Sequence, residues 1–413
     1  MTERTIETDV LVIGGGMAGC FAAIKAQEKG VSVTLVDKGY TGKSGQSPFA
    51  GTFAVFNPEW GHHLSEWMEQ VNTVGEYVNH REWTEIGFLD SYDRYLDLRS
   101  WGVAFEAEPP HGAGPPSDAG PPRPRLGPCQ AQHLGWRKHA EILRKQVLKS
   151  GAKIMDRILV VQLLKQEGRI VGAMGLPVET TEILVFRAKA TVLCAGAGGF
   201  KPPGWPIHAL TSDGDAMAYR AGAEITGKEY TDPHPTRAEN PAYFGSIMKD
   251  GRPIFGRMFN AEGEPVKGRG TLFLDLEFEA HAGRAPITQK TPIGEFTKIG
   301  GAASGMSVHK AEGIWPADTD CSTNLPGLFA AGDALGNMQS GAVYAAIGMA
   351  LSGASVTGAR AGWSAADYAL QVDEPEIGTG TVLLLKESIF GPLERNGGFG
   401  PRWVTQVLQN TMI

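Results

Sequence analysis

The chain has 413 residues, enough for two or three domains with a large buried core. Its 38 lysines and arginines stand against 45 aspartates and glutamates, a formal net charge of −7, which argues against electrostatic binding to nucleic acid or an anionic membrane. Hydrophobic residues make up 42% and charged residues 20%, so the chain is neither intrinsically disordered nor a charge-rich coiled coil.

The cysteines, the N-terminus and the longest uncharged stretch argue against further classes. Cysteines stand at positions 20, 129, 194 and 321, too far apart for a CxxC pair, so we expect reduced thiols and no metal site. The first ten residues are polar and acidic, unlike a signal peptide. The uncharged stretch 334–359 is built from Gly, Ala and Ser, which predicts a buried helix and no membrane span. We therefore expect a soluble, cytoplasmic protein.

The predicted elements begin with a β-α-β unit. A strand over 9–13 leads into a glycine turn, a helix over 20–28 and a strand over 31–36 that ends at Asp37. A unit of about 30 residues with this order is typical of dinucleotide-binding folds.

Helices and strands follow in alternation. Helical spacing of apolar residues predicts helical segments over 66–101, 136–150, 213–223, 340–360 and 403–413. Apolar runs predict strands over 154–164, 170–175, 183–188, 190–193 and 328–333. The Pro- and Gly-rich run 109–128 predicts a surface loop, and the turn-rich region 229–299 predicts a small second domain. The last helix has no stop signal, so we expect the chain to be a fragment or to have a further tail.

Three glycine motifs follow predicted strands. In Gly14-x-Gly16-x-x-Gly19, glycines permit a tight turn, a close approach to pyrophosphate and close helix–strand packing, and Asp37 can accept hydrogen bonds from a ribose. Far along the chain, the strand before Gly332-Asp333 ends in a carboxylate that can bind the ribityl or pyrophosphate part of FAD, which favours FAD over NAD. The run 195–199 offers small residues that admit a dinucleotide.

Six motifs together resemble a known family. They are GGGMAG at 14–19, KSGQSPFAG at 43–51, LCAGAGGF at 193–200, DPHPT at 232–236, TKIGG at 297–301 and TNLPGLFAAGD at 323–333. In this order they resemble the succinate dehydrogenase/fumarate reductase flavoprotein family, whose relatives include L-aspartate oxidase, the adenylylsulfate reductase flavoprotein and the ketosteroid dehydrogenases. The resemblance spans residue 9 to about residue 362.

The resemblance implies an α/β fold, in which a Rossmann-type FAD-binding domain is interrupted by a small α+β capping domain and the substrate lies between cap and flavin. The implied domains are the first part of the FAD-binding domain over 1–232, the capping domain over 233–303, the second part of the FAD-binding domain over 304–365 and a C-terminal helical segment over 366–413.

The resemblance also assigns cofactor-binding residues. They are Gly14, Gly16, Met17, Ala18, Gly19, Asp37, Lys38, Lys43, Ser44, Gly45, Gln46, Ala50, Gly51, Ala195, Gly196, Asp213, Gly332, Asp333, Ser340, Ala342 and Val343. The segment 340–343 matches one whose helix N-terminus faces the flavin, where the helix dipole stabilises negative charge on the reduced ring. Gly45 stands where the respiratory enzymes have the histidine that bonds covalently to FAD, so FAD is expected to be non-covalent here.

The catalytic candidates are less well defined. His234 and Thr236 match residues that contact the substrate carboxylate in the family, and Gly300 and Gly301 match a glycine pair beside the substrate. Arg237 is a candidate anion ligand. Arg269 and Lys298 are candidates to donate a proton or to face the substrate. For Arg237 and Arg269 a solvated surface position is the alternative interpretation, and for His234 it is a structural role between two prolines.

Two carboxylate-binding arginines of the family are unaccounted for, which counts against succinate or fumarate. The leading hypothesis is an FAD-dependent oxidoreductase that interconverts C–C and C=C bonds next to a carbonyl or carboxylate by hydride transfer at flavin N5. The alternatives are a ketone desaturase like the ketosteroid dehydrogenases, a flavoprotein like that of adenylylsulfate reductase, or a non-catalytic protein that only binds flavin. The sequence contains no second nucleotide motif for NAD(P)H, so we expect electrons to come from a separate protein or a small carrier.

Overall fold

The computed structural model describes most of the 413 residues and groups their strands into four sheets. The described residues are 2–106, 128–134, 138–180, 182–198, 210–230, 234–237, 258–266, 278–279, 282–290, 296–303, 313–342 and 344–412. The predicted loop over 109–128 lies almost entirely outside them, as does Arg269.

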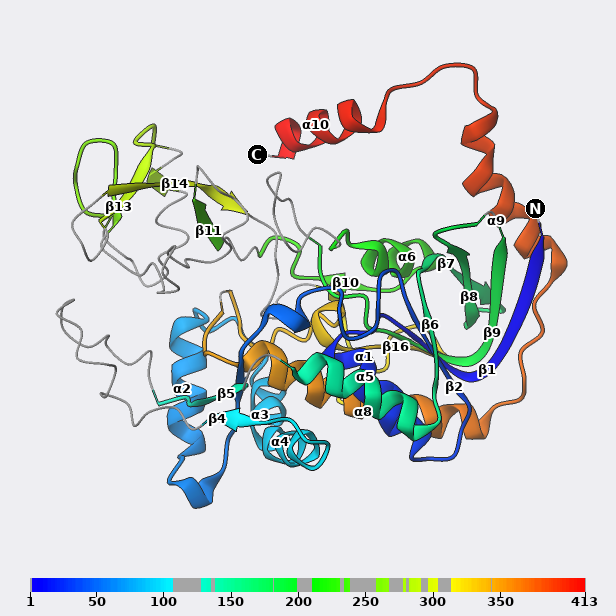
Figure 1. The fold of residues 1–413 in the computed structure, drawn as a ribbon, viewed down its shortest axis with the longest axis horizontal. Helices are drawn as coiled ribbons and strands as arrows, with labels where there is room; N and C mark the ends of the chain where they lie inside the picture. The colour runs from blue at the N-terminus through cyan, green and yellow to red at the C-terminus, as the bar shows by residue number, and fades with distance from the viewer. Residues whose placement is uncertain are drawn as a thin grey trace.

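A seven-stranded sheet forms the centre of the molecule (Figure 1). Its parallel strands are β1 (Glu3–Ile13), β2 (Val33–Asp37), β6 (Lys153–Asp156), β9 (Ile183–Leu193) and β16 (Leu328–Ala330). Their order is β6-β2-β1-β9, with β16 beside the C-terminal half of β9. The antiparallel hairpin of β7 (Ile158–Gln166) and β8 (Arg169–Pro177) joins the N-terminal half of β9. This is a Rossmann-type α/β arrangement.

Two helices with small residues cover the first strands. The first, α1 (Met17–Gln27), follows β1 directly and is buried along almost its whole length. The other, α8 (Met349–Gln371), packs closely on α1. The two helices are so close that a Cβ on Gly358 would overlap the carbonyl oxygen of Ala18, and a Cβ on Gly362 that of Ala22. Small residues thus let α8 hold α1 in place, and the N-terminus of α1 then points at the end of the sheet.

Several predicted boundaries were wrong. The helical region over 66–101 is three helices, α2 (Leu64–Val74), α3 (Arg81–Leu89) and α4 (Ser91–Ser100). The run 154–164 is split between β6 and β7. The two runs over 183–193 form one strand, in which the ammonium of Lys189 is accommodated by a 2.7 Å bond to Asp9. The predicted helix over 340–360 begins only at Met349.

The remaining described elements surround the main sheet. The helices are α5 (His139–Ser150), α6 (Asp213–Ala221), α9 (Thr379–Phe390) and α10 (Pro401–Met412). A three-stranded sheet contains β3 (Thr52–Ala54), β5 (Ala131–Leu134) and β4 (Phe105–Glu106), and a two-stranded sheet contains β10 (Ile225–Thr226) and β15 (Gly313–Ile314).

A separate four-stranded sheet has the order β11 (His234–Arg237), β14 (Phe296–Ala303), β13 (Ile287–Lys290) and β12 (Met258–Phe259). Figure 1 shows this sheet apart from the seven-stranded one. It lies within the predicted cap, whose boundaries and capping role remain predictions.

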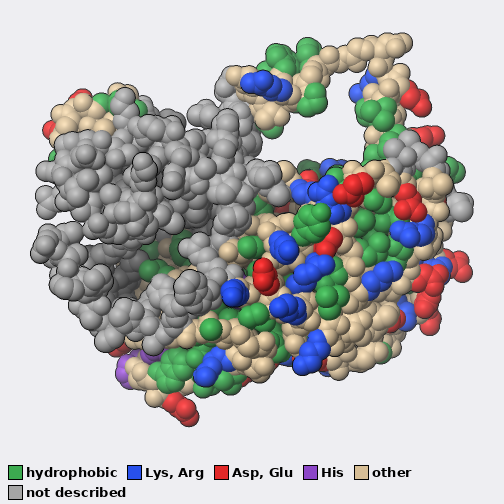
Figure 2. Space-filling view, viewed as in Figure 1, with side chains coloured by type: hydrophobic (Ala, Val, Ile, Leu, Met, Phe, Trp, Pro, Cys, Tyr) green, Lys and Arg blue, Asp and Glu red, His purple; other side chains and the backbone are tan. Residues whose placement is uncertain are grey.

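The molecular surface is mixed in charge. On the face shown in Figure 2, basic and acidic side chains are interspersed over the central sheet and its helices. Across the described residues, no helix combines the length and apolar character needed to cross a membrane, and no group of His, Cys, Asp or Glu is arranged to hold a metal ion. None of the four cysteines, which all lie in the described part of the chain, forms a disulfide bond.

Candidate cofactor site

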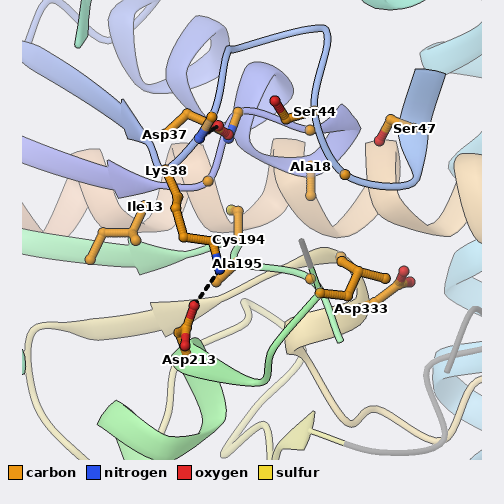
Figure 3. Close-up of a pocket in the computed structure, with 18 of the residues that line it drawn as sticks. Ile13, Ala18, Asp37, Lys38, Ser44, Ser47, Cys194, Ala195, Asp213 and Asp333 are labelled. Carbon is orange, nitrogen blue, oxygen red and sulfur yellow. Dashed lines mark hydrogen bonds and ion pairs between the residues drawn. The ribbon is translucent and has the colours of Figure 1, made fainter. Parts of the chain in front are cut away.

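A cavity opens at the carboxyl ends of β1, β2 and β9 (Figure 3). The cavity is partly open to solvent, so a ligand can enter it from the surface. Its walls come from segments far apart in sequence, which are 13–18, 36–39, 44–47, 158–160, 194–196, 210–217 and 332–333. In open α/β sheets this edge is where ligands bind.

The glycine turn after β1 forms one wall. Gly14 has φ +108°, and a Cβ there would overlap the carbonyl oxygen of Cys194, so only glycine fits. Gly16 precedes α1 and faces the cavity. It has no side chain to cap the helix, and no acidic residue follows in the first turn of α1. This helix N-terminus is therefore suited to an anion such as a pyrophosphate.

Asp37 at the end of β2 forms the next part of the wall. Its two carboxylate oxygens accept hydrogen bonds from the backbone N–H groups of Gly15 and Gly39, each at 2.7 Å. Burial raises the pKa of the Asp37 carboxyl, as does nearby Asp156, although the two backbone donors and Lys38 act in the opposite direction. The carboxylate is thus fixed in orientation at the place where a ribose hydroxyl would donate to it.

Lys38 and Asp213 link two walls of the cavity. The ammonium of Lys38, just after β2, lies 2.6 Å from the carboxylate of Asp213 at the start of α6 and donates to Thr211 at 2.7 Å. Figure 3 shows this pair between the β2 and α6 sides of the cavity. Both side chains remain more than one third exposed.

The loop after β2 closes the side of the cavity nearest α1. The Ser47 hydroxyl accepts a hydrogen bond from the backbone N–H of Met17 at 2.9 Å, which connects the loop to the start of α1. Ser44 accepts from the backbone N–H of Tyr40 at 2.7 Å. Gly45 lines the cavity, and a Cβ there would meet no atom within 4 Å. Gly45, which the resemblance aligns with the family's covalent histidine, therefore lies beside open space.

These features fit the adenosine and pyrophosphate parts of FAD. The cavity combines a helix N-terminus without its own cap, an oriented carboxylate and a strand end whose backbone admits close approach.

Fourteen of the predicted cofactor residues line this cavity. They are Gly14, Gly16, Met17, Ala18, Asp37, Lys38, Ser44, Gly45, Gln46, Ala195, Gly196, Asp213, Gly332 and Asp333. Gly19 lies one turn into α1, where a Cβ would overlap the carbonyl oxygen of Gly14, so it serves helix–strand packing.

The other predicted cofactor residues that the structure describes do not line the cavity. Lys43 is exposed, and Ala50 and Gly51 lie further along the chain before β3. In the segment before α8, Ser340 is buried and Ala342 is half-buried, and Val343 falls outside the described residues. Since α8 begins at Met349, the prediction of a helix N-terminus at 340–343 was wrong.

The residues predicted to contact the substrate lie on two strands that pair with each other. In the antiparallel pair of β11 and β14, Thr236 is opposite Gly300, Arg237 is opposite Ile299, and His234 is opposite Ala303. Gly301 and Lys298 belong to the same strand β14. Two segments separated by about 60 residues in the chain are thus neighbours in one sheet. Their predicted roles remain proposals.

Sequence reasoning missed several residues of the cavity wall. Ile158, Leu159 and Val160 come from the start of β7, and Leu210, Thr211 and Met217 come from α6 and the residues before it. Their only sequence signal is an apolar strand start and a helix start, which many segments share. Ser47 and Gly39 were also missed, although both lie in the loop after β2, which contains the predicted residues Ser44, Gly45 and Gln46.

Comparison with known proteins identifies the cofactor. The chain matches the family described as FAD binding domain over residues 9–265. It is 27% identical to one of the subunits of the fumarate reductase (CoM/CoB) of Methanothermobacter marburgensis, over the whole of this chain and 82% of that protein.

Two solved structures share the fold. The apo form of the Mycobacterium smegmatis Sdh1 complex matches with a TM-score of 0.78 at 23% identity, covering 100% of this chain and 77% of that chain. Adenylylsulfate reductase of Archaeoglobus fulgidus matches with a TM-score of 0.73 at 19% identity, covering 95% and 74%. With the family match over more than half of its length, the chain belongs to the FAD-binding flavoproteins of the fumarate reductase/succinate dehydrogenase type and is an FAD-dependent oxidoreductase.

Proposed function

We propose that the chain interconverts a C–C single bond and a C=C double bond next to a carbonyl or carboxylate. The observation that supports this most is the cavity at the ends of β1, β2 and β9, whose wall joins the glycine turn, Asp37 and Asp333 in a chain of this family. FAD, when bound, supplies the hydride acceptor or donor at N5. The relatives include fumarate reductase flavoprotein subunits, and fumarate has such a double bond between its two carboxylates.

The residues of this chain would bind and orient both molecules. The start of α1 and Asp37 would hold the pyrophosphate and ribose, and Asp333 would hold the ribityl end. The strands β11 and β14 would supply the substrate site, where backbone N–H groups near Gly300 and Gly301 polarise a carbonyl and His234 or Lys298 donates a proton.

The substrate need not be a dicarboxylate. The segment in which the resemblance places a carboxylate-binding arginine holds Asn337 and Gln339 here, whose side chains are neutral and at most 1% exposed. Within the described residues, neither amide atom of the Gln339 side chain has a hydrogen-bond partner. Neutral amides in place of a guanidinium favour a ketone or enone over a dicarboxylate as the second candidate substrate.

An anaerobic reoxidation experiment separates these possibilities. The FAD-loaded protein is photoreduced and mixed with fumarate, with a cyclic enone, or with AMP and sulfite controls beside adenylylsulfate, and the flavin absorbance is followed. We expect rapid reoxidation by fumarate or by the enone. Reoxidation by adenylylsulfate alone would move the protein to the adenylylsulfate reductase branch. A flavin that none of the acceptors reoxidises would contradict the proposal.

We also propose that FAD is held without a covalent bond, because Gly45 offers no nucleophile at the position of the family's histidine. Acid precipitation should release all flavin into the supernatant. Flavin that stays with the pellet would contradict this. The electrons are proposed to come from a separate electron-transfer protein, since the relatives include flavoprotein subunits.

A further inference from the structure

The loop Gly39–Ser47 is attached to the rest of the molecule through two elements that do not line the cavity. This loop contributes Gly39 and the stretch Ser44–Ser47 to the cavity wall. Its other side faces α5 and the end of β6. Neither Arg144 of α5 nor Asp156 of β6 lines the cavity itself.

Asp156 is the centre of this attachment. One carboxylate oxygen accepts the backbone N–H of Thr41 at 2.8 Å, and the other lies 2.7 Å from the guanidinium of Arg144. The same guanidinium donates to the carbonyl of Thr41 at 3.3 Å. Thr41 is therefore held at both of its backbone polar groups by one ion pair, and its side chain is fully buried.

The contacts of Thr41 extend directly to the glycine turn. The backbone N–H of Gly42 donates to the carbonyl of Gly15 at 3.0 Å, and a Cβ on Gly15 would meet the Thr41 hydroxyl at 2.7 Å. On its other side Gly15 donates its own N–H to Asp37. Gly15 is thus held between the loop and the oriented carboxylate, in the middle of the wall proposed to hold pyrophosphate and ribose.

The helix α5 supports the loop at two further points. A Cβ on Gly42 would overlap the carbonyl oxygen of Ala140, so the loop backbone lies directly on the start of α5. The Nε2 atom of His139 lies 2.8 Å from the carbonyl oxygen of Ser47, the residue whose hydroxyl accepts from Met17.

We propose that Arg144 and Asp156 are positioning residues for the cofactor: their ion pair holds Thr41, and through it the glycine turn and the loop, in the geometry that binds FAD. The inference rests on the proposed assignment of the cavity as the FAD site. The pair acts through backbone groups, because neither side chain reaches the cavity.

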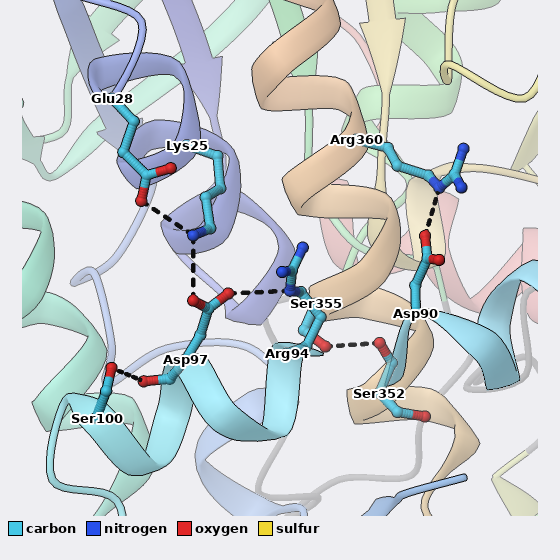
Figure 4. Close-up of polar contacts among 9 residues, drawn as sticks. All are labelled: Lys25, Glu28, Asp90, Arg94, Asp97, Ser100, Ser352, Ser355 and Arg360. Carbon is cyan, nitrogen blue, oxygen red and sulfur yellow. Dashed lines mark hydrogen bonds and ion pairs between the residues drawn. The ribbon is translucent and has the colours of Figure 1, made fainter. Parts of the chain in front are cut away.

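The test compares this ion pair with a second one of matched geometry. Arg360 of α8 and Asp90, just before α4, also lie 2.7 Å apart and are partly exposed, at 25% and 33% against 31% and 15% for Arg144 and Asp156 (Figure 4). Neither Arg360 nor Asp90 lines the cavity. The variants are Arg144→Met, Asp156→Asn and their double, with Arg360→Met and Asp90→Asn as controls. For each FAD-depleted full-length chain, thermal stability, FAD affinity and the FAD dissociation rate are measured well below its melting temperature.

We expect Asp156→Asn and Arg144→Met each to raise the Kd for FAD about tenfold, mainly through faster dissociation. The Kd for FAD of the double variant should not exceed the higher of the two single-variant values, because the two residues act as one unit. Arg144→Lys, which keeps the charge, should recover part of the affinity. Asp156→Ala also removes the acceptor for the backbone N–H of Thr41, so this variant should bind FAD more weakly than Asp156→Asn. The control variants Arg360→Met and Asp90→Asn should lower thermal stability as much as the Arg144 and Asp156 variants do, and their Kd for FAD should stay within twofold of that of the parent chain.

Two results would overturn the proposal. One is an unchanged Kd in the folded Asp156→Asn and Arg144→Met chains. The other is an equal rise of Kd in the control pair, which would reveal a general loss of stability. Failure of the site assignment is recognised separately through Gly16→Asp. If that variant leaves the Kd unchanged, the cavity is not the FAD site. If it abolishes binding while the Arg144 and Asp156 variants bind normally, only the positioning role is wrong.

Discussion

Two glycine-rich segments of this molecule look alike in sequence and differ in use. In the turn after β1, Gly16 faces the cavity, and a Cβ there would meet only the Ser47 hydroxyl, at 3.1 Å. In the segment before α8, Gly341 has φ +77°, and a Cβ would overlap the carbonyl oxygen of Gly75, to which Ala342 also donates its N–H at 3.1 Å. A glycine can therefore face an open cavity in one place and permit the close approach of another backbone in the other.

The substitution with the largest expected effect on the cofactor is Gly16→Asp. The new Cβ would meet only the Ser47 hydroxyl, at 3.1 Å, so this hydroxyl must shift slightly, and the carboxylate would stand at the start of α1, where the pyrophosphate is proposed to bind. We expect FAD affinity to fall by about a hundredfold or more, roughly 2.7 kcal/mol, while the chain still folds. Flavin retained after desalting measures this, and Gly16→Ala, which adds a methyl without a charge, is the matched control.

The Gly341→Ala variant tests the other side of the comparison. A Cβ in this left-handed conformation, against the Gly75 carbonyl, should lower the free energy of unfolding by about 3 kcal/mol. At temperatures where the variant is folded, its Kd for FAD should stay within twofold of that of the parent. Denaturant unfolding and an FAD titration measure the two quantities. A stable variant that has lost FAD would place Ser340–Ala342 in the cofactor site after all.

Acidification should act on the cavity through Asp37, whose pKa burial raises above its usual range. The ionised carboxylate is the form that accepts from a ribose hydroxyl, so FAD affinity should fall by about tenfold as the pH drops through this raised pKa. The effect on the FAD-free chain has the opposite sign. Protonation relieves the burial cost, so the contribution of Asp37 to stability is present at low pH and lost as the pH rises through its folded-state pKa.

The control for this prediction is Asp37→Asn, in which both dependences should disappear over the same pH range. The groups that face this carboxyl are Lys38 and Asp156, and the latter is paired with Arg144. An equally steep loss of FAD affinity in Asp37→Asn would assign the titration to another group.

The smallest expected effect comes from Lys38→Met. Its ion pair with Asp213 spans the cavity at 2.6 Å, but both side chains are more than one third exposed, and such pairs contribute about 1 kcal/mol or less. The Kd for FAD should rise about threefold at low ionic strength, and the difference should vanish in high salt. A large effect that persists in salt would show that Lys38 contacts FAD directly.

The sequence predicted the β-α-β unit and its glycine turn because all their determinants lie within about 30 consecutive residues. Asp37 and Gly16 could be assigned because turn, helix and strand follow one another directly. The residues from β7 and α6 could not. Leu159 reaches the cavity through the pairing of β7 with β8 and of β8 with β9, and Thr211 reaches it beside Gly198, with which it forms a bridge. The wrong start predicted for α8 has the same origin: nothing local reveals that Gly341 packs on Gly75.

The paired strands β11 and β14 show the same limit for the substrate region. The motifs around His234 and Gly300 were recognised separately, and only the antiparallel register places Thr236 opposite Gly300. A sequence pattern can identify each segment by its residues. The contact between the two segments depends on the fold, which brings them together across about 60 intervening residues.

A calorimetric titration of the FAD-depleted chain with FAD tests the central claim that this cavity is the cofactor site. The account predicts one FAD per chain for the parent protein and for Gly341→Ala, competition by ADP for the same site, and an affinity lower by about a hundredfold or more for Gly16→Asp. Binding of FAD to Gly16→Asp with the affinity of the parent, or binding that ADP does not reduce, would contradict it.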